Sequence, residues 1–174
     1  MMDADGPEQV RDHDAIYFGA VGWENVPDHI SLWGLRLRLC QGFDQWANVR
    51  PVQFLPGITS PLRKADDTEL DWVVVRENSE GEYAGFGGRN FSGREGLGEI
   101  ATQSAVFTEV GCERIMRFAF DLARTRRGKV TSMEKRNVMK SGLYWNEVVT
   151  RIHRDEYGDL ELEHMLADAG GMQL

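Results

Sequence analysis

The chain has 174 residues, of which 41% are apolar, and its 20 basic and 28 acidic side chains give a formal net charge of −8. This composition supplies enough apolar residues for a buried core and excludes disordered and collagen-like proteins. Because the chain is acidic and has no basic run, we expect no nucleic-acid partner and no membrane partner.

The termini and cysteines indicate the compartment. Cys40 and Cys112 lie far apart in the sequence, so neither a Cys-x-x-Cys redox pair nor a zinc pair is present. The first residues, MMDADGPEQVRDHD, are acidic and polar, unlike a secretory signal. No apolar run is long enough to span a membrane. We therefore predict a cytoplasmic protein.

Apolar runs predict the regular elements. Four runs, each followed by glycine or polar residues, predict buried strands at 15–18, 71–75, 129–133 and 160–166. Between the last three lie two helical patterns, one with apolar residues from Ile115 to Ala123 and one from Trp145 to Ile152. The order strand, helix, strand, helix, strand predicts an α/β fold, in which ligands bind beyond the carboxyl ends of the strands.

A glycine-rich polar stretch, 85–98, separates the second strand from the first helix. Residues 102–106 after it predict a short strand, so that 85–106 together would form a protruding hairpin or arm.

Several arginines interrupt apolar or aromatic neighbourhoods and are candidate ligands of a small dicarboxylate, because a guanidinium binds a carboxylate through two parallel hydrogen bonds. These are Arg36, Arg38, Arg50 and Arg76. The structural alternative is that they form salt bridges to Asp28, Asp44 or Glu77. For any single arginine this alternative is the commoner one, since surface ion pairs are frequent.

Three further residues have two interpretations each. Tyr83 is a core tyrosine or a proton donor, and Lys135, directly after a predicted strand, is a solvated lysine or a general base. Asp168 is a candidate ligand for Mg²⁺ or Mn²⁺, although one carboxylate does not make a metal site. The segment 85–90 lacks the last glycine of a dinucleotide-binding fingerprint, and no histidine has a partner at ligand spacing.

Five segments, taken in order, resemble the isocitrate/isopropylmalate dehydrogenase family of β-hydroxyacid oxidative decarboxylases. They are 14–22 (DAIYFGAVG), 26–34 (VPDHISLWG), 43–52 (FDQWANVRPV), 73–83 (VVVRENSEGEY) and 131–137 (TSMEKRN). The second and fourth favour the tartrate/D-malate dehydrogenase branch over 3-isopropylmalate dehydrogenase, which stays an alternative. The resemblance implies NAD-dependent oxidation and decarboxylation of a small 2-hydroxy dicarboxylate, assisted by Mg²⁺ or Mn²⁺.

The resemblance also implies roles for single residues. Arg50 and Arg76 match substrate-carboxylate arginines, and Tyr83 matches the tyrosine that protonates the enol carbon after decarboxylation. Lys135 matches the lysine that helps to deprotonate the hydroxyl. Asn137 matches an asparagine near substrate and nicotinamide, and Asp168 matches the first metal-binding aspartate. In the family, the lysine and this aspartate reach the other subunit's site, so a homodimer is expected.

Two departures from the family pattern are visible. Where the family often has a further substrate arginine, this chain has Cys40, and Arg36 or Arg38 is the candidate replacement. Family chains are also roughly twice as long, so the resemblance implies an isocitrate/isopropylmalate dehydrogenase-like fold truncated at both ends. Residues 1–45 would be a remnant of the nucleotide-binding domain, and 46–174 the substrate and dimerisation domain with its arm. A catalytically inactive fragment that keeps the dimer interface is the alternative function.

Overall fold

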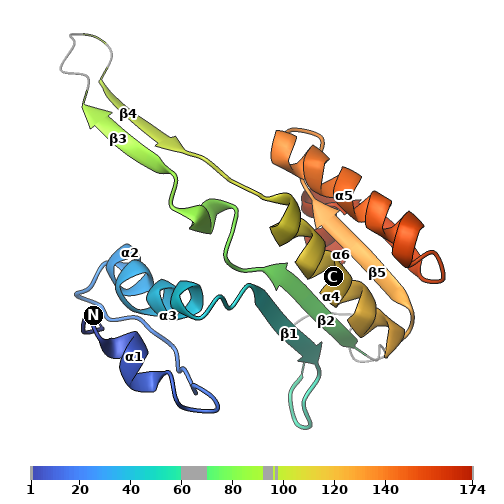
Figure 1. The fold of residues 1–174 in the computed structure, drawn as a ribbon, viewed down its shortest axis with the longest axis horizontal. Coiled ribbons are helices and arrows are strands. Elements are labelled where there is room, and N and C mark those ends of the chain that lie inside the picture. Colours follow the sequence, from blue (N-terminus) through green and yellow to red (C-terminus); the bar gives the residue numbers. More distant parts are fainter. Residues whose placement is uncertain (1, 60–69, 92–95, 97, 174) are drawn as a thin grey trace. The chain divides into compact units, whose positions relative to one another are not determined.

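The computed structural model describes residues 2–59, 70–91, 96 and 98–173. The chain divides into two compact units, Met1–Trp46 (unit 1) and Ala47–Leu174 (unit 2), drawn in Figure 1. The assignment of the first unit to a nucleotide-binding domain stays a prediction.

Unit 1 consists of short helices: α1 (Gly6–Val10), α2 (Asp28–Ser31), the π-helical turn η1 (Leu32–Arg36) and α3 (Leu37–Gly42). The last three follow one another without a break. Leu37 and Leu39 of α3 are buried, and the Arg11 guanidinium lies 5.3 Å from the centroid of the Phe43 ring. These contacts hold the amino-terminal helix segment against α3.

The strand predicted at 15–18 is wrong. This segment forms neither helix nor strand, and Tyr17 is fully exposed while Ile16 and Phe18 are 37% and 40% exposed. A strand is stable only beside another strand that takes up its N–H and C=O groups. In the described part of unit 1 no strand offers such an edge, so the apolar pattern alone does not suffice.

Unit 2 begins with an antiparallel ribbon of β1 (Ala47–Gln53) and β2 (Asp71–Glu77), paired from Ala47 opposite Glu77 to Gln53 opposite Asp71. β2 confirms the strand predicted at 71–75 and continues two residues further. β1 was not predicted, because Asn48, Arg50 and Pro51 interrupt its apolar pattern. The ribbon is half-buried rather than fully buried.

The predicted hairpin exists. After the 3-10 turn η3 (Glu82–Ala84), strands β3 (Gly87–Phe91) and β4 (Glu99–Gln103) pair antiparallel, and the hairpin extends away from helices α4 and α5 (Figure 1). Its second strand begins earlier than the predicted 102–106. At its base Gly81 bridges Val106 with φ +70°, and a Cβ there would lie 2.9 Å from the Phe107 ring. This position therefore requires glycine.

The rest of unit 2 is helix and parallel strand in alternation. It contains α4 (Glu109–Arg124), β5 (Lys129–Glu134), α5 (Lys140–Glu156), β6 (Glu161–Leu166) and α6 (Ala167–Gln173). β5 and β6 are parallel. Both predicted helices and the strands at 129–133 and 160–166 are confirmed, because their apolar periods are long and regular.

The core of unit 2 lies where α4 packs against α5, β2 and β5. Its fully buried apolar side chains come mainly from the two helices: Cys112, Ile115, Met116, Phe120, Val148, Val149 and Ile152. The result is a mixed α/β fold with three two-stranded sheets among the described residues. No described helix has both the length and the apolar character that crossing a membrane requires.

Candidate functional site

The β1–β2 ribbon presents predicted arginines on one face. Asn48 pairs with Arg76 and Arg50 with Val74, so the side chains of all four project from the same side of the ribbon, because side chains alternate along a strand. Arg50 Nε donates to Asn48 Oδ1 at 2.9 Å, and Asn48 Nδ2 donates to Asn78 Oδ1 at 3.3 Å. A chain of two amides thus orients the exposed Arg50 side chain.

The second ribbon arginine contacts the predicted tyrosine. Arg76 Cζ lies 4.7 Å from the centroid of the Tyr83 ring, and both residues are half-buried. The 3-10 turn η3 brings Tyr83 back beside the end of β2. A guanidinium over an aromatic face is held by the ring quadrupole. Arg50, Arg76 and Tyr83, with Asn48 and Asn78, form what we call the arginine–tyrosine cluster.

Glu77, one of the carboxylates that the structural alternative requires, is not the partner of Arg76. Its buried side chain accepts hydrogen bonds from the Ser79 N–H at 2.7 Å, the Glu80 N–H at 3.1 Å and the Ser79 hydroxyl at 2.7 Å. The turn after β2 is therefore closed by Glu77, and the guanidinium of Arg76 is directed to Tyr83.

Lys135 and Asp168 meet at the carboxyl ends of two parallel strands. The register of β5 and β6 sets Glu134 opposite Leu166, so the residues that follow lie at one edge of the sheet, where α/β proteins place ligands. The Lys135 ammonium donates to both carboxylate oxygens of Asp168. The lysine side chain is 33% exposed and the aspartate 67%. This lysine–aspartate pair is open to a ligand from solvent.

The backbone around Lys135 is fixed by the start of α5. The carbonyl of Lys135 accepts from Met139 N at 2.9 Å and from Val138 N at 3.2 Å. Gly142 packs against this turn so closely that a Cβ would lie 2.7 Å from the Lys135 carbonyl carbon. Asn137 lies in the same turn and is exposed. Lysine and asparagine are thus presented from a short, tightly held connection.

The candidates from unit 1 differ from one another. Arg38 donates to the carbonyls of Met2 and Ala4, both at 3.0 Å, so its guanidinium holds the amino-terminal segment. Arg36 is half-buried at the end of the π-helical turn, an irregularity frequent at functional sites. Arg36 and Arg38 both stay candidates for the replacement of the family arginine.

Three residues of the site were missed by sequence reasoning. Asn48 and Asn78 each lie two positions from a predicted arginine, and the strand period would have placed them on the same face had β1 been recognised. Gly142 gave no usable signal, because its close approach to Lys135 depends on how α5 returns to β5.

The described residues do not by themselves complete a metal site. Mg²⁺ and Mn²⁺ take about six oxygen ligands, whereas Asp168 offers one carboxylate, and no group of three His, Cys, Asp or Glu residues comes together in the part of the chain that is described. Residues 87–90 of the glycine-rich stretch belong to hairpin strand β3 and open no helix.

Two other groups near the core have shifted pKa values. Burial, and then the positive charge of Arg136, lower the pKa of His164, whose Nδ1 lies 2.8 Å from Asn146 Nδ2. Burial, reinforced by Glu80, raises the pKa of Cys112 to about 12. The Cys112 thiol is therefore protonated at neutral pH and is excluded as a nucleophile.

Comparison with known proteins shows the family that the sequence resembles. The family model described as isocitrate/isopropylmalate dehydrogenase matches residues 2–174. A probable tartrate dehydrogenase/decarboxylase of Agrobacterium vitis is 54% identical over 171 residues, which are 97% of this chain and 47% of that protein. The decarboxylating D-malate dehydrogenase of Escherichia coli K12 is 49% identical over 152 residues, 86% of this chain and 42% of the relative.

Solved structures show the same relationship. The isocitrate dehydrogenase of Methylococcus capsulatus superposes with a TM-score of 0.74 at 28% identity, covering 99% of this chain and 48% of that one. The chain belongs to the isocitrate/isopropylmalate dehydrogenase family. It spans about half the length of the curated relatives it matches.

Proposed function

We propose that this chain supplies the substrate-binding and proton-transfer residues of an NAD-dependent and Mg²⁺- or Mn²⁺-dependent dehydrogenase that oxidises and decarboxylates tartrate, D-malate or a similar 2-hydroxy dicarboxylate. The observation that carries the proposal is the lysine–aspartate pair at the ends of β5 and β6. It is supported by the identity of 54% with a probable tartrate dehydrogenase/decarboxylase.

The substrate's carboxylates bind the arginine–tyrosine cluster in this proposal. Arg50 and Arg76 provide guanidinium groups on one ribbon face, suited to bidentate carboxylate binding, and Arg36 or Arg38 of unit 1 is the candidate for a third contact. Tyr83, in contact with Arg76, donates a proton to the enol carbon after decarboxylation.

Lys135, as the neutral amine and not as the ammonium that donates to Asp168, would accept the hydroxyl proton. Bound NAD would take the hydride, and Asn137 would lie near its nicotinamide. A bound divalent cation would polarise the substrate hydroxyl. Asp168 would contribute one of its oxygen ligands, and the others would come from outside the described residues. The Lys135 ammonium, which donates to this carboxylate, would compete with the cation for it.

We also propose that the chain acts as a homodimer joined through the β3–β4 arm. Every residue of β4 is exposed, and an exposed hairpin offers strand edges to a second copy. Deletion of residues 85–106 is expected to lower the molecular mass measured by light scattering to that of a monomer. An unchanged mass would count against the arm as the dimer contact.

A hybrid enzyme tests the catalytic proposal. The matched region of the Agrobacterium vitis relative is replaced by the aligned residues of this chain, and NADH formation is followed with Mn²⁺ and D-malate, tartrate or 3-isopropylmalate. We expect turnover with D-malate or tartrate, and a loss of about 10²- to 10⁴-fold in kcat for Lys135→Ala, the range for a general base. Lys140→Ala, at the exposed start of α5, is the matched control.

The rival function is a catalytically inactive fragment that keeps the dimer interface, and it makes the opposite prediction. A hybrid that is folded and dimeric but inactive with all three substrates would support the rival function. Turnover only with 3-isopropylmalate would show that 3-isopropylmalate, and not tartrate or D-malate, is the substrate. We expect residues 1–174 alone to reduce no NAD, because the described residues offer one metal carboxylate. Turnover by this chain that Lys135→Ala abolishes would contradict that expectation.

A further inference from the structure

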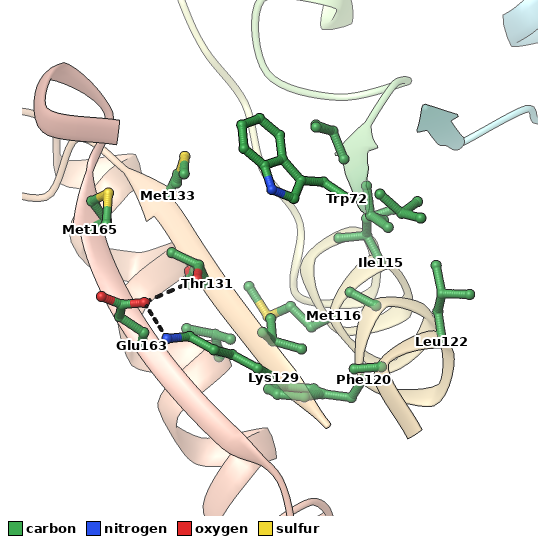
Figure 2. A pocket seen from close by; sticks show the side chains of 18 of the residues that line it. Trp72, Ile115, Met116, Phe120, Leu122, Lys129, Thr131, Met133, Glu163 and Met165 are labelled. Carbon is green, nitrogen blue, oxygen red and sulfur yellow. Dashed lines mark hydrogen bonds and ion pairs between the residues drawn. The ribbon is translucent and has the colours of Figure 1, made fainter. Parts of the chain in front are cut away.

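Strand β1, which carries Arg50, is supported through its partner β2. The two strands pair along their whole length, and β2 in turn packs against α4. Figure 2 shows the α4 side of β2, where Trp72 of the strand and Ile115 of the helix line the same apolar cavity. β2 is therefore seated on the core of unit 2, and β1 reaches this core through β2.

The Arg50 guanidinium is held by a neutral group. Its Nε donates to Asn48 Oδ1 at 2.9 Å, and within the described part of the chain no carboxylate forms an ion pair with it. An amide oxygen accepts a hydrogen bond without carrying a charge. The guanidinium is thus fixed in place and keeps its full positive charge, which an aspartate in place of Asn48 would neutralise.

Asn48 is itself held by a buried residue. Its Nδ2 donates to Asn78 Oδ1 at 3.3 Å, and Asn78 is only 6% exposed. Asn78 lies in the turn after β2, and Glu80 of the same turn accepts from the Thr108 N–H at 2.9 Å and from the Thr108 hydroxyl at 2.6 Å. Because Thr108 is the N-cap of α4, the support of the arginine begins at this helix.

The hydrogen bond at Nε decides how Arg50 can bind a carboxylate. A guanidinium forms two parallel hydrogen bonds along its side edge, with Nε–H and one Nη–H, or along its end edge, with one N–H from each Nη. Because Asn48 occupies Nε, the side edge lacks one of its two donors. The end edge of this exposed arginine keeps both.

The second arginine of the cluster does not share this support. Arg76 lies opposite Asn48 in the ribbon, but its guanidinium lies over the Tyr83 ring, 4.7 Å from the centroid. Asn48 therefore acts on one of the two arginines, and a comparison of the two can test its role.

We propose that Asn48, anchored by Asn78, is a positioning residue for substrate binding: it holds Nε of Arg50 so that the charged guanidinium receives one substrate carboxylate along its end edge. This role rests on the proposed function, to which it adds how the carboxylate is bound.

The first test reads the hydrogen bond and needs no turnover. In residues 1–174, NMR measures how fast the Arg50 Nε proton exchanges with water. We expect Asn48→Leu, which removes the acceptor, to speed this exchange by about tenfold or more. Asn48→Asp keeps an acceptor and should keep the proton protected. Gln53→Ala, on the opposite face of β1, is the matched control and should leave the exchange unchanged.

The second test uses the hybrid enzyme with D-malate or tartrate. Asn48→Leu should raise KM about three- to tenfold at nearly unchanged kcat, because substrate must then order a long side chain that is no longer held. Asn48→Asp should raise KM further, because it neutralises Arg50. In an Arg50→Lys background, which has no Nε–H donor, Asn48→Leu should have no further effect. In an Arg76→Lys background the rise in KM should persist.

Three results would overturn the role of Asn48. They are a wild-type Nε proton that exchanges as fast as in Asn48→Leu, an equal rise in KM in the Arg50→Lys and Arg76→Lys backgrounds, and a fall in kcat larger than the rise in KM. An inactive hybrid would contradict the proposed function instead, and the exchange rate would then decide by itself whether Asn48 positions Arg50.

Discussion

The two units of this chain differ in how far they bury their large apolar side chains. In unit 2, Phe120 is completely buried and Ile152 is 1% exposed, whereas in unit 1 Tyr17 is fully exposed and Trp23 is 73% exposed. Unit 2 has parallel strands beside two long helices, so its apolar side chains face one another. Large apolar side chains are buried only where a neighbouring element covers them, and sequence hydrophobicity does not supply that neighbour.

The largest change in stability is expected for a substitution at the centre of unit 2, and it tests this difference in burial. Phe120→Ala should lower the free energy of unfolding by about 3–5 kcal/mol, through lost burial and a cavity, measured by urea denaturation. Trp23→Ala removes a larger side chain from unit 1 and should change stability by less than about 0.5 kcal/mol. Similar losses for both variants would show that the exposed aromatic of unit 1 is buried in solution.

A smaller effect is expected where α5 approaches the lysine–aspartate pair. Gly142→Ala introduces a methyl group against the Lys135 backbone and should cost about 1–3 kcal/mol, as overpacking does. Gly171→Ala, in α6 with nothing within 4 Å of the new Cβ, should stabilise the helix by up to about 1 kcal/mol. Thermal unfolding distinguishes the two signs, and a neutral Gly142→Ala would contradict the close packing.

The smallest effect concerns the pH dependence of unit 2. Because the pKa of His164 is lowered in the folded state, the unfolded chain binds the proton more tightly, so stability is fully present above the ordinary pKa of about 6.5 and is lost as the pH falls below it. His164→Gln should weaken this loss in urea titrations at a series of pH values. His13→Gln, in the exposed amino-terminal segment, should keep the wild-type profile.

Sequence patterns predicted the parts of unit 2 whose period is regular. The strands at 71–75, 129–133 and 160–166 and both long helices were confirmed, because runs of buried residues report directly on such elements. The pattern failed for β1, whose Arg50 and Pro51 look unlike a strand interior. Lys135 and Asp168 were predicted separately, each after a strand, and only the parallel pairing of β5 and β6 in the structure brings them together.

The sequence by itself determined the family and the α/β order of unit 2, and it supplied the residues that we propose for catalysis. Only the tertiary structure decided that Arg38 holds the amino-terminal segment, that Arg76 contacts Tyr83, and that residues 15–18 form no strand. The reason is physical: a local pattern sets which face of an element is apolar, but the partner of a guanidinium or of a strand edge comes from residues far away in the chain.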